Sequence, residues 1–281
     1  MLTKVAHLAD RSTRYLEAGS GRPIVLLHAF PLSAELWLPQ LSRVPVGCRI
    51  VAPDLRGFRG SGPAFEDPGL QGVTMDGYAS DVLALMTHLE IERAVIGGES
   101  MGGYVAFAML RRAPERVAGL VLANTRASAD SAEGRANRDR MIELVRREGP
   151  GAIAREMGPK LLGATTQREQ PDLVEAIGRM IRMNSTEAIA AGLAAMRDRP
   201  DSTPLLRSIA CPTTIVTGGE DAIIPAAESA AMHAAIPGSR LTVLPKVGHL
   251  ANVEGTGDFS TVLARWEPEV PGANAPTTSG S

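Results

Sequence analysis

Short apolar runs alternate with longer amphipathic segments up to about residue 125, and the alternation resumes near residue 209. The apolar runs have the length of strands, and the segments between them have helical spacing. This alternation is typical of an α/β fold, in which a mostly parallel central sheet is flanked by helices. The predicted strands cover residues 13–16, 24–27, 49–52, 94–97, 119–123, 213–217 and 241–244.

The alternation of strands and helices stops in the middle of the chain. Every periodic segment between residues 127 and 205 has helical spacing, and prolines separate these segments. We therefore predict a core of residues 1–126 and 206–270 and a helical cap (lid) of residues 127–205, inserted over the strand ends. Such a cap shapes a substrate pocket and restricts water. The tail 271–281 is rich in Pro, Ala, Thr, Ser and Gly and is predicted to be disordered. The four predicted cap helices cover residues 135–147, 152–161, 172–183 and 187–197.

The pentapeptide GESMG at 98–102 is the strongest candidate for chemistry. It fits the pattern G-x-S-x-G, and it lies between the strand predicted at 94–97 and an apolar helical segment. In a strand–turn–helix context this pattern lifts a serine hydroxyl above the sheet as a nucleophile. Ser100 is therefore the predicted nucleophile. Glu99 beside it must be hydrogen-bonded or neutral if it is buried, and we expect a structural or supporting role for it.

A serine hydroxyl needs a base that takes its proton and a carboxylate that orients the base. In this architecture the order along the chain is serine, acid, histidine. Asp221 follows one late predicted strand, and His249 lies in a Gly-His turn after the next. Glu220 is a competing carboxylate, but Asp221 is favoured because an apolar turn follows it. We predict that Ser100, Asp221 and His249 form a catalytic triad.

Acyl transfer also requires backbone N–H groups that stabilise the developing oxyanion. The amide of Met101, at the start of a helix, is one predicted donor. The amide of Phe30, in the loop after the strand at 24–27, is the other. His28 in the same loop is predicted to hold the turn by side-chain hydrogen bonds, since the position of the base is already filled.

Taken in order, five motifs resemble the α/β-hydrolase superfamily, in the branch of small esterases, 3-oxoadipate enol-lactonase-like enzymes and cofactor-free perhydrolases. The motifs are HAFP at 28–31, DLRGF at 54–58, GESMG at 98–102, GED at 219–221 and VGH at 247–249. The resemblance covers nearly the whole chain and implies an α/β-hydrolase fold without a cofactor or metal. Two positions depart from the family pattern, because Ala29 and Arg59 stand where the family often has glycine. A Cβ at position 29 is tolerable if the backbone keeps a negative φ.

The predicted reaction is hydrolysis of a small carboxylic ester or lactone through an acyl-enzyme. Serine at position 100 argues against the aspartate nucleophile that haloalkane dehalogenases and epoxide hydrolases use. Two enzymatic alternatives remain open: an enol-lactonase acting on an anionic lactone of aromatic catabolism, and a perhydrolase in which hydrogen peroxide replaces water. The alternative from another class is a non-catalytic receptor for a small ligand on the same fold.

Substrate choice is expected to depend on the cap. Met141 and Met183 fall in its predicted helices, where adaptable thioethers suit apolar acyl groups or, alternatively, pack the helices together. Arg126 follows the strand at 119–123, so it could bind a substrate carboxylate or pair with Asp130 instead. Trp37, soon after the oxyanion loop, could border the pocket or belong to the core.

The amino-acid composition and charge say more about the binding partners of the protein than about the reaction it catalyses. The 281 residues carry a formal net charge of −2 and are 44% hydrophobic, so a large core is expected and neither nucleic acid nor a membrane surface is an expected partner. No apolar run approaches about 20 residues, and no signal-peptide pattern opens the chain. We therefore expect a cytoplasmic enzyme with reduced thiols at Cys48 and Cys211. A homo-oligomer is compatible with the sequence.

Overall fold

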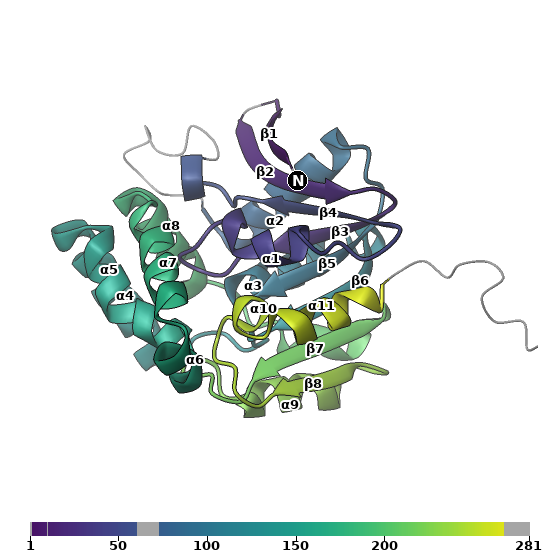
Figure 1. The fold of residues 1–281 in the computed structure, drawn as a ribbon. Coiled ribbons are helices and arrows are strands. Elements are labelled where there is room, and N and C mark those ends of the chain that lie inside the picture. Colours follow the sequence, from purple (N-terminus) through teal and green to yellow (C-terminus); the bar gives the residue numbers. More distant parts are fainter. Residues whose placement is uncertain (1, 10, 61–72, 267–281) are drawn as a thin grey trace, which may run out of the picture.

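The computed structural model describes residues 2–9, 11–60 and 73–266, so the tail 271–281 lies outside the described residues. Its centre is an eight-stranded sheet in the order β1-β2-β4-β3-β5-β6-β7-β8 (Figure 1). β2 is antiparallel to both of its neighbours, and the other strands are parallel, which confirms the predicted α/β class. The strands are β1 (Leu2–His7), β2 (Ser12–Gly19), β3 (Arg22–Leu27), β4 (Cys48–Pro53), β5 (Ala94–Glu99), β6 (Val117–Ala123), β7 (Thr213–Gly218) and β8 (Arg240–Leu244).

Two helical layers cover the faces of this sheet (Figure 1). The first layer consists of α2 (Met75–His88), α3 (Met101–Arg112) and α9 (Ala226–Ala235). The second consists of α1 (Leu38–Leu41), α10 (Ala251–Glu254) and α11 (Thr256–Ala264). Along β3, Val25 and Leu27 belong to the core under the first layer, whereas Ile24 and Leu26 belong to the core under the second. Burial of both faces explains why this strand is continuously apolar.

A helical insert connects β6 to β7 and forms a group of its own beside the sheet (Figure 1). It contains five α-helices where four were predicted, because the six-residue α6 buries only Thr166 and has no apolar periodicity to reveal it. Proline begins both α5 and α7, where its missing N–H costs no helical hydrogen bond. The helices of the insert are α4 (Ala132–Glu148), α5 (Pro150–Met157), α6 (Ala164–Glu169), α7 (Pro171–Arg182) and α8 (Thr186–Arg197).

The edge strand β1 was not predicted from the sequence. Of its six residues only Ala6 is buried, so it lacks the apolar run that marks the inner strands. Within the described residues, no helix is both long and apolar enough to cross a membrane. Short 3₁₀ helices in the connections cover Ala34–Trp37, Phe58–Gly60, Pro114–Arg116, Gly158–Leu161 and Thr203–Ser208.

Candidate active site

Ser100 occupies a strained turn between β5 and α3. Its backbone has φ of 53° and ψ of −111°, and its amide donates to the carbonyl of Ala123 at 2.8 Å. Glycine is needed on both sides of this turn. A Cβ on Gly98 would lie 2.3 Å from the carbonyl carbon of Gly102, and a Cβ on Gly102 would lie 2.2 Å from the carbonyl oxygen of Leu27. The close approach of helix and strand therefore explains the G-x-S-x-G pattern in steric terms.

The structure brings Ser100, His249 and Asp221 into one hydrogen-bonded chain. The Nε2 atom of His249 lies 2.7 Å from Oγ of Ser100, and its Nδ1 atom lies 2.8 Å from Oδ2 of Asp221. Only 8% of Ser100 and 1% of His249 is exposed to solvent. These three residues follow β5, β8 and β7, so the ends of three parallel strands bring them together.

Asp221 is held as a carboxylate by several donors. Its Oδ1 accepts the amides of Ile223 and Ile224 at 2.8 and 3.0 Å, and its Oδ2 accepts Nδ2 of Asn124 at 2.8 Å. Burial alone would raise the pKa of Asp221, but the hydrogen bonds from His249, Ile224 and Asn124 outweigh burial and lower it. Asn124 was missed in the sequence, where a lone asparagine after a strand carries no pattern. It also donates to the carbonyl of Gly248 at 3.1 Å, next to His249.

Glu220, the competing carboxylate, faces the insert. Its Oε2 accepts the amide of Thr165 at 2.7 Å, and its Oε1 accepts the Thr165 hydroxyl at 2.6 Å. These hydrogen bonds lower the pKa of Glu220, so it is ionised at neutral pH. The two adjacent acids therefore contact different parts of the structure. Glu220 binds the insert, and Asp221 lies beside the imidazole of His249.

The loop after β3 is held by His28. Its Nε2 accepts the amide of Leu55 at 3.0 Å, and its Nδ1 lies 3.0 Å from the carbonyl of Ala29, which fits the predicted structural role. Complete burial lowers the pKa of His28 to about 4, so the ring is neutral. Ala29 is not among the described residues with positive φ, so its Cβ is accommodated. Phe30 beside it lines the cavity next to Ser100.

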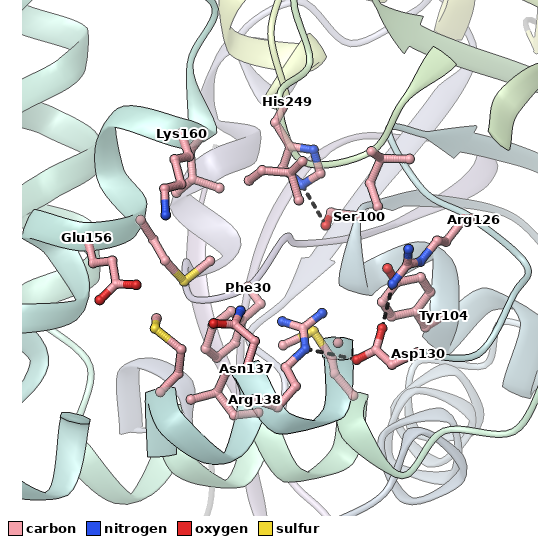
Figure 2. A pocket seen from close by; sticks show the side chains of 18 residues that line it. Phe30, Ser100, Tyr104, Arg126, Asp130, Asn137, Arg138, Glu156, Lys160 and His249 are labelled. Carbon is pink, nitrogen blue, oxygen red and sulfur yellow. Dashed lines mark hydrogen bonds and ion pairs between the residues drawn. The ribbon is translucent and has the colours of Figure 1, made fainter. Parts of the chain in front are cut away.

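A cavity of about 210 Å³ opens above the serine, between the strand ends and the insert (Figure 2). Arg126 and Met141 are among the residues that line it. Its other lining residues are Phe30, Ser100, Tyr104, Asp130, Gly134, Asn137, Arg138, Glu156, Met157, Lys160, Leu161, Leu193, Met196, Ile223, Ile224 and His249.

Trp37 and Met183 do not line this cavity, which corrects the prediction for both. Trp37 is fully buried in the core under the second helical layer, where its ring centroid lies 5.7 Å from that of Phe259. Met183 caps the end of α7 and is 56% exposed, with its sulfur near the Arg59 guanidinium. Which way a side chain faces depended in both cases on packing that the sequence pattern does not encode.

Asp130 gathers three arginines in the cavity wall. Its carboxylate accepts Arg126 at 2.5 Å, Arg138 at 3.1 Å and Arg199 at 2.9 Å, although its side chain is only 1% exposed. Burial would raise the pKa of Asp130, but the arginines Arg138 and Arg199 outweigh burial and lower it. Arg126 is therefore already paired with Asp130, the alternative that the sequence left open. Of the three guanidinium groups that face this carboxylate, those of Arg126 and Arg138 line the cavity, as does Lys160, so these cations outnumber the lining acids Asp130 and Glu156.

Arg138 and Lys160 were missed in the sequence and are the cations best placed for a ligand. Arg138 uses Nε for Asp130, and among the described residues its two terminal nitrogens have no acceptor. Figure 2 shows this guanidinium extending into the cavity, with Lys160 on another side. The nearby Glu156 is paired with Arg140, whose Nη1 donates to Oε2 of Glu156 at 3.1 Å. Both missed cations lie in segments that the sequence predicts to be helical, at 135–147 and 152–161, but helical spacing does not show which polar side chains face a cavity.

Residues 22–256, well over half of the chain, match the protein family described as the alpha/beta hydrolase fold. The chain belongs to this family. It is thus a hydrolase of the alpha/beta hydrolase superfamily, which confirms the resemblance deduced from its five motifs.

Solved and curated relatives of this hydrolase include esterases and lactonases. A thermophilic esterase from Thermogutta terrifontis, solved with malate bound, is 39% identical with a TM-score of 0.88 and covers 95% of this chain and 98% of its own. The enol-lactonase from Burkholderia xenovorans LB400 is 26% identical with a TM-score of 0.84, over 93% of this chain and 98% of its own. The dihydrolipoyllysine-residue acetyltransferase component of an acetoin cleaving system from Pseudomonas putida is 31% identical over 89% of this chain. The hydrolase spans only 65% of that relative, less than two thirds of its length.

Glu99 of this hydrolase is completely buried directly before the serine. Neither carboxylate oxygen has a hydrogen-bond partner of normal geometry among the described residues. Burial raises the pKa of Glu99 well above its ordinary value; the backbone of Ala251 lowers it, and the charges of Asp221 and Glu254 raise it further. Burial therefore favours the protonated form of Glu99, and the sequence leads us to expect a hydrogen-bonded or neutral side chain if this residue is buried.

Proposed function

We propose that this hydrolase cleaves small carboxylic esters or lactones through an acyl-enzyme on Ser100. The hydrogen-bonded chain from Ser100 through His249 to Asp221 is the observation that supports this proposal. His249 takes the proton of the serine hydroxyl as Oγ attacks the carbonyl, then donates it to the leaving alcohol. Asp221 holds the Nδ1–H tautomer and stabilises the imidazolium. Water activated by His249 then releases the acid and frees the serine.

The oxyanion of each tetrahedral intermediate is assigned to the amides of Met101 and Phe30. Met101 begins α3, where the first N–H groups lack helical acceptors, and Phe30 lines the cavity beside Ser100. Among the described residues, neither amide has a hydrogen-bond acceptor. Two such donors would each contribute about 100- to 1,000-fold in kcat.

Hydrolysis of p-nitrophenyl acetate and butyrate tests the reaction class. Ser100→Ala should lower kcat by at least about 10⁴-fold, because the covalent step is lost. Ser208→Ala, at an exposed serine in a 3₁₀ helix, is the matched control and should keep full activity. A fluorophosphonate should add one label to the wild type and none to Ser100→Ala. Turnover that survives in Ser100→Ala would remove the acyl-enzyme from the mechanism.

A second candidate, hydrolysis of anionic esters or lactones, is favoured by the cations in the insert. Arg138 presents two terminal nitrogens to the cavity and Lys160 an ammonium group, and both lie on the lining shared with Ser100. A guanidinium fork suits a carboxylate at the end of an acyl chain. The relatives include an esterase solved with malate and an enol-lactonase, which agrees with such a ligand.

A matched substrate pair separates the two candidates. Monoethyl succinate and ethyl butyrate differ mainly by a carboxylate in place of a terminal methyl group. The anionic candidate predicts a kcat/KM at least about tenfold higher for monoethyl succinate, since a hydrogen bond to a charged group contributes roughly 1.5–3 kcal/mol. Equal values for the two esters would leave only the neutral candidate.

A further inference from the structure

Two carboxylates of the sheet half of the protein hold the start of α6 in the insert. Glu254 of α10 accepts the amide of Gly163 on Oε2 at 2.7 Å. Glu220, after β7, accepts the amide and the hydroxyl of Thr165 at 2.7 and 2.6 Å. Three hydrogen bonds with charged acceptors therefore cross from the insert to the loops beneath it, over a span of three residues.

The same two carboxylates belong to the loops that carry the proposed acid and base. Glu220 directly precedes Asp221 in the chain. Glu254 also accepts the amides on either side of His249: that of Gly248 on Oε2 at 3.0 Å, and that of Leu250 on Oε1 at 3.0 Å. One oxygen of Glu254 thus serves the insert and the histidine loop together. Any shift of that carboxylate would move the backbone that orients the imidazole.

The two segments meet backbone against backbone, with no room for a side chain. A Cβ on Gly163 would lie 2.7 Å from Oε2 of Glu220 and 2.9 Å from the amide nitrogen of Gly248. A Cβ on Gly248 would lie 2.0 Å from the amide nitrogen of Gly163. Glycine at both positions lets the two backbones approach closely enough for the carboxylates of Glu254 and Glu220 to accept their amide donors.

The held segment is continuous with the wall of the cavity. Lys160 and Leu161 line the cavity, and Gly163 and Thr165 follow within four residues. The end of the wall is therefore attached to the loops of the proposed acid and base, and not only to other helices of the insert.

We propose that Glu254 and Glu220 are positioning residues that dock the insert onto the loops carrying His249 and Asp221. This inference rests on the proposed function, because it takes the roles of those two residues from it. Glu254 acts on the imidazole through the flanking amides, so its loss changes kcat. Within the part of the chain that the structure describes, the side chain of Glu220 hydrogen-bonds to Thr165 of the insert alone, so its loss changes the cavity wall and hence KM. The two carboxylates thus couple substrate binding to alignment of the base.

The test compares Glu254→Gln, Glu220→Ala and Glu220→Gln by kcat, KM and the pH profile of kcat/KM with p-nitrophenyl butyrate. Glu254→Gln places an amide NH₂ among three backbone N–H donors, so kcat should fall about 10- to 100-fold, with KM within threefold. Glu220→Ala should raise KM about three- to tenfold with kcat nearly unchanged. Glu220→Gln should restore KM, because its carbonyl accepts the Thr165 amide and its NH₂ can donate to the hydroxyl.

Glu143→Gln, an exposed acid on α4, is the matched control and should match the wild type in all three measurements. Hydrogen exchange gives a readout that does not depend on activity. Glu254→Gln should speed exchange at the amides of residues 163, 248 and 250 together, whereas Glu220→Ala should speed it at 165 alone. If the wild type exchanges as expected but hydrolyses no ester, the proposed function fails and the docking stands. Unchanged hydrogen exchange in the Glu254 and Glu220 variants would overturn the docking proposal. A fall in kcat no larger than the fraction of protein unfolded at the assay temperature would also overturn it.

Discussion

The cavity has two walls of different character, one from the strand ends and one from the insert. On the strand side the polar groups of Ser100, His249 and Asp221 are committed to each other at 2.7 and 2.8 Å. On the insert side Arg138 keeps two terminal nitrogens without an acceptor among the described residues. Side chains whose hydrogen bonds are satisfied by one another keep a fixed geometry, which suits catalysis. Side chains with unused hydrogen-bond donors are suited to binding a ligand. This difference supports our proposal that groups at the strand ends carry out the reaction and groups of the insert select the substrate.

The largest expected effect comes from replacing one carboxylate oxygen of Asp221, on the strand side of the cavity. Asp221→Asn should lower kcat by about 10⁴-fold, because an amide can no longer hold the Nδ1–H tautomer of His249 or stabilise the imidazolium. Steady-state hydrolysis of p-nitrophenyl butyrate measures it. Glu220→Gln is the adjacent control, expected within a few fold of the wild type. Equal losses in the two variants would contradict the assignment of the acid to Asp221.

On the strand side, the predictions for Ser100, Asp221 and His249 each rest on a local feature of the sequence. The turn at Ser100 requires glycine at positions 98 and 102 for steric reasons, and both glycines are part of the G-x-S-x-G motif. Asp221 and His249 follow strands, and the ends of parallel strands meet at one edge of a sheet. Asn124 lies at the same edge but was missed, since nothing in its neighbours distinguishes it from any other polar residue after a strand.

The insert side was not predictable because its side chains face the cavity only through tertiary packing. Met141 and Met183 lie in the insert, yet the first lines the cavity and the second is exposed at the end of α7. Helical periodicity identifies a buried face but does not say which buried contact it makes. Arg138 and Lys160 were missed for the same reason, because a cation on a polar helix usually faces water.

The second effect concerns stability and tests the charged cluster of the insert side. Asp130→Ala should lower the free energy of unfolding by about 3–5 kcal/mol, because the nearly buried Arg199 loses its counter-ion. The pKa of Asp130 is lowered in the folded state, so its stabilisation is present above the ordinary value of 3.8 and is lost as the pH falls. Urea unfolding at pH 7 and pH 3 should therefore give a difference from the wild type that shrinks at the lower pH. Asp139→Ala, at an exposed ion pair with Arg197, is the control and should change stability by less than about 1 kcal/mol.

A smaller effect sharpens the comparison by separating binding from chemistry. Arg138→Gln should raise KM for monoethyl succinate about 10- to 100-fold and leave ethyl butyrate within threefold, because only the charged substrate loses a charge-assisted hydrogen bond. Arg135→Gln, on the same helix and exposed, is the matched control. An equal loss for both esters would show that Arg138 supports the fold of the wall instead of recognising an anion.

The last expected effect is a gradual pH dependence of stability that originates on the strand side, at Glu99. The folded protein keeps the proton of this buried acid above pH 4.5, the ordinary pKa near which the unfolded chain releases it. The unfolded state then binds fewer protons, so the free energy of unfolding falls with rising pH, by about 1.4 kcal/mol for each pH unit between the two pKa values. Glu99→Gln keeps the shape of the side chain and removes the titration. Its stability by urea unfolding should therefore exceed that of the wild type at pH 8 and approach it at pH 4. A difference that does not change with pH would mean that Glu99 is ionised in the folded protein, and the strand side would then hold a buried charge beside Ser100.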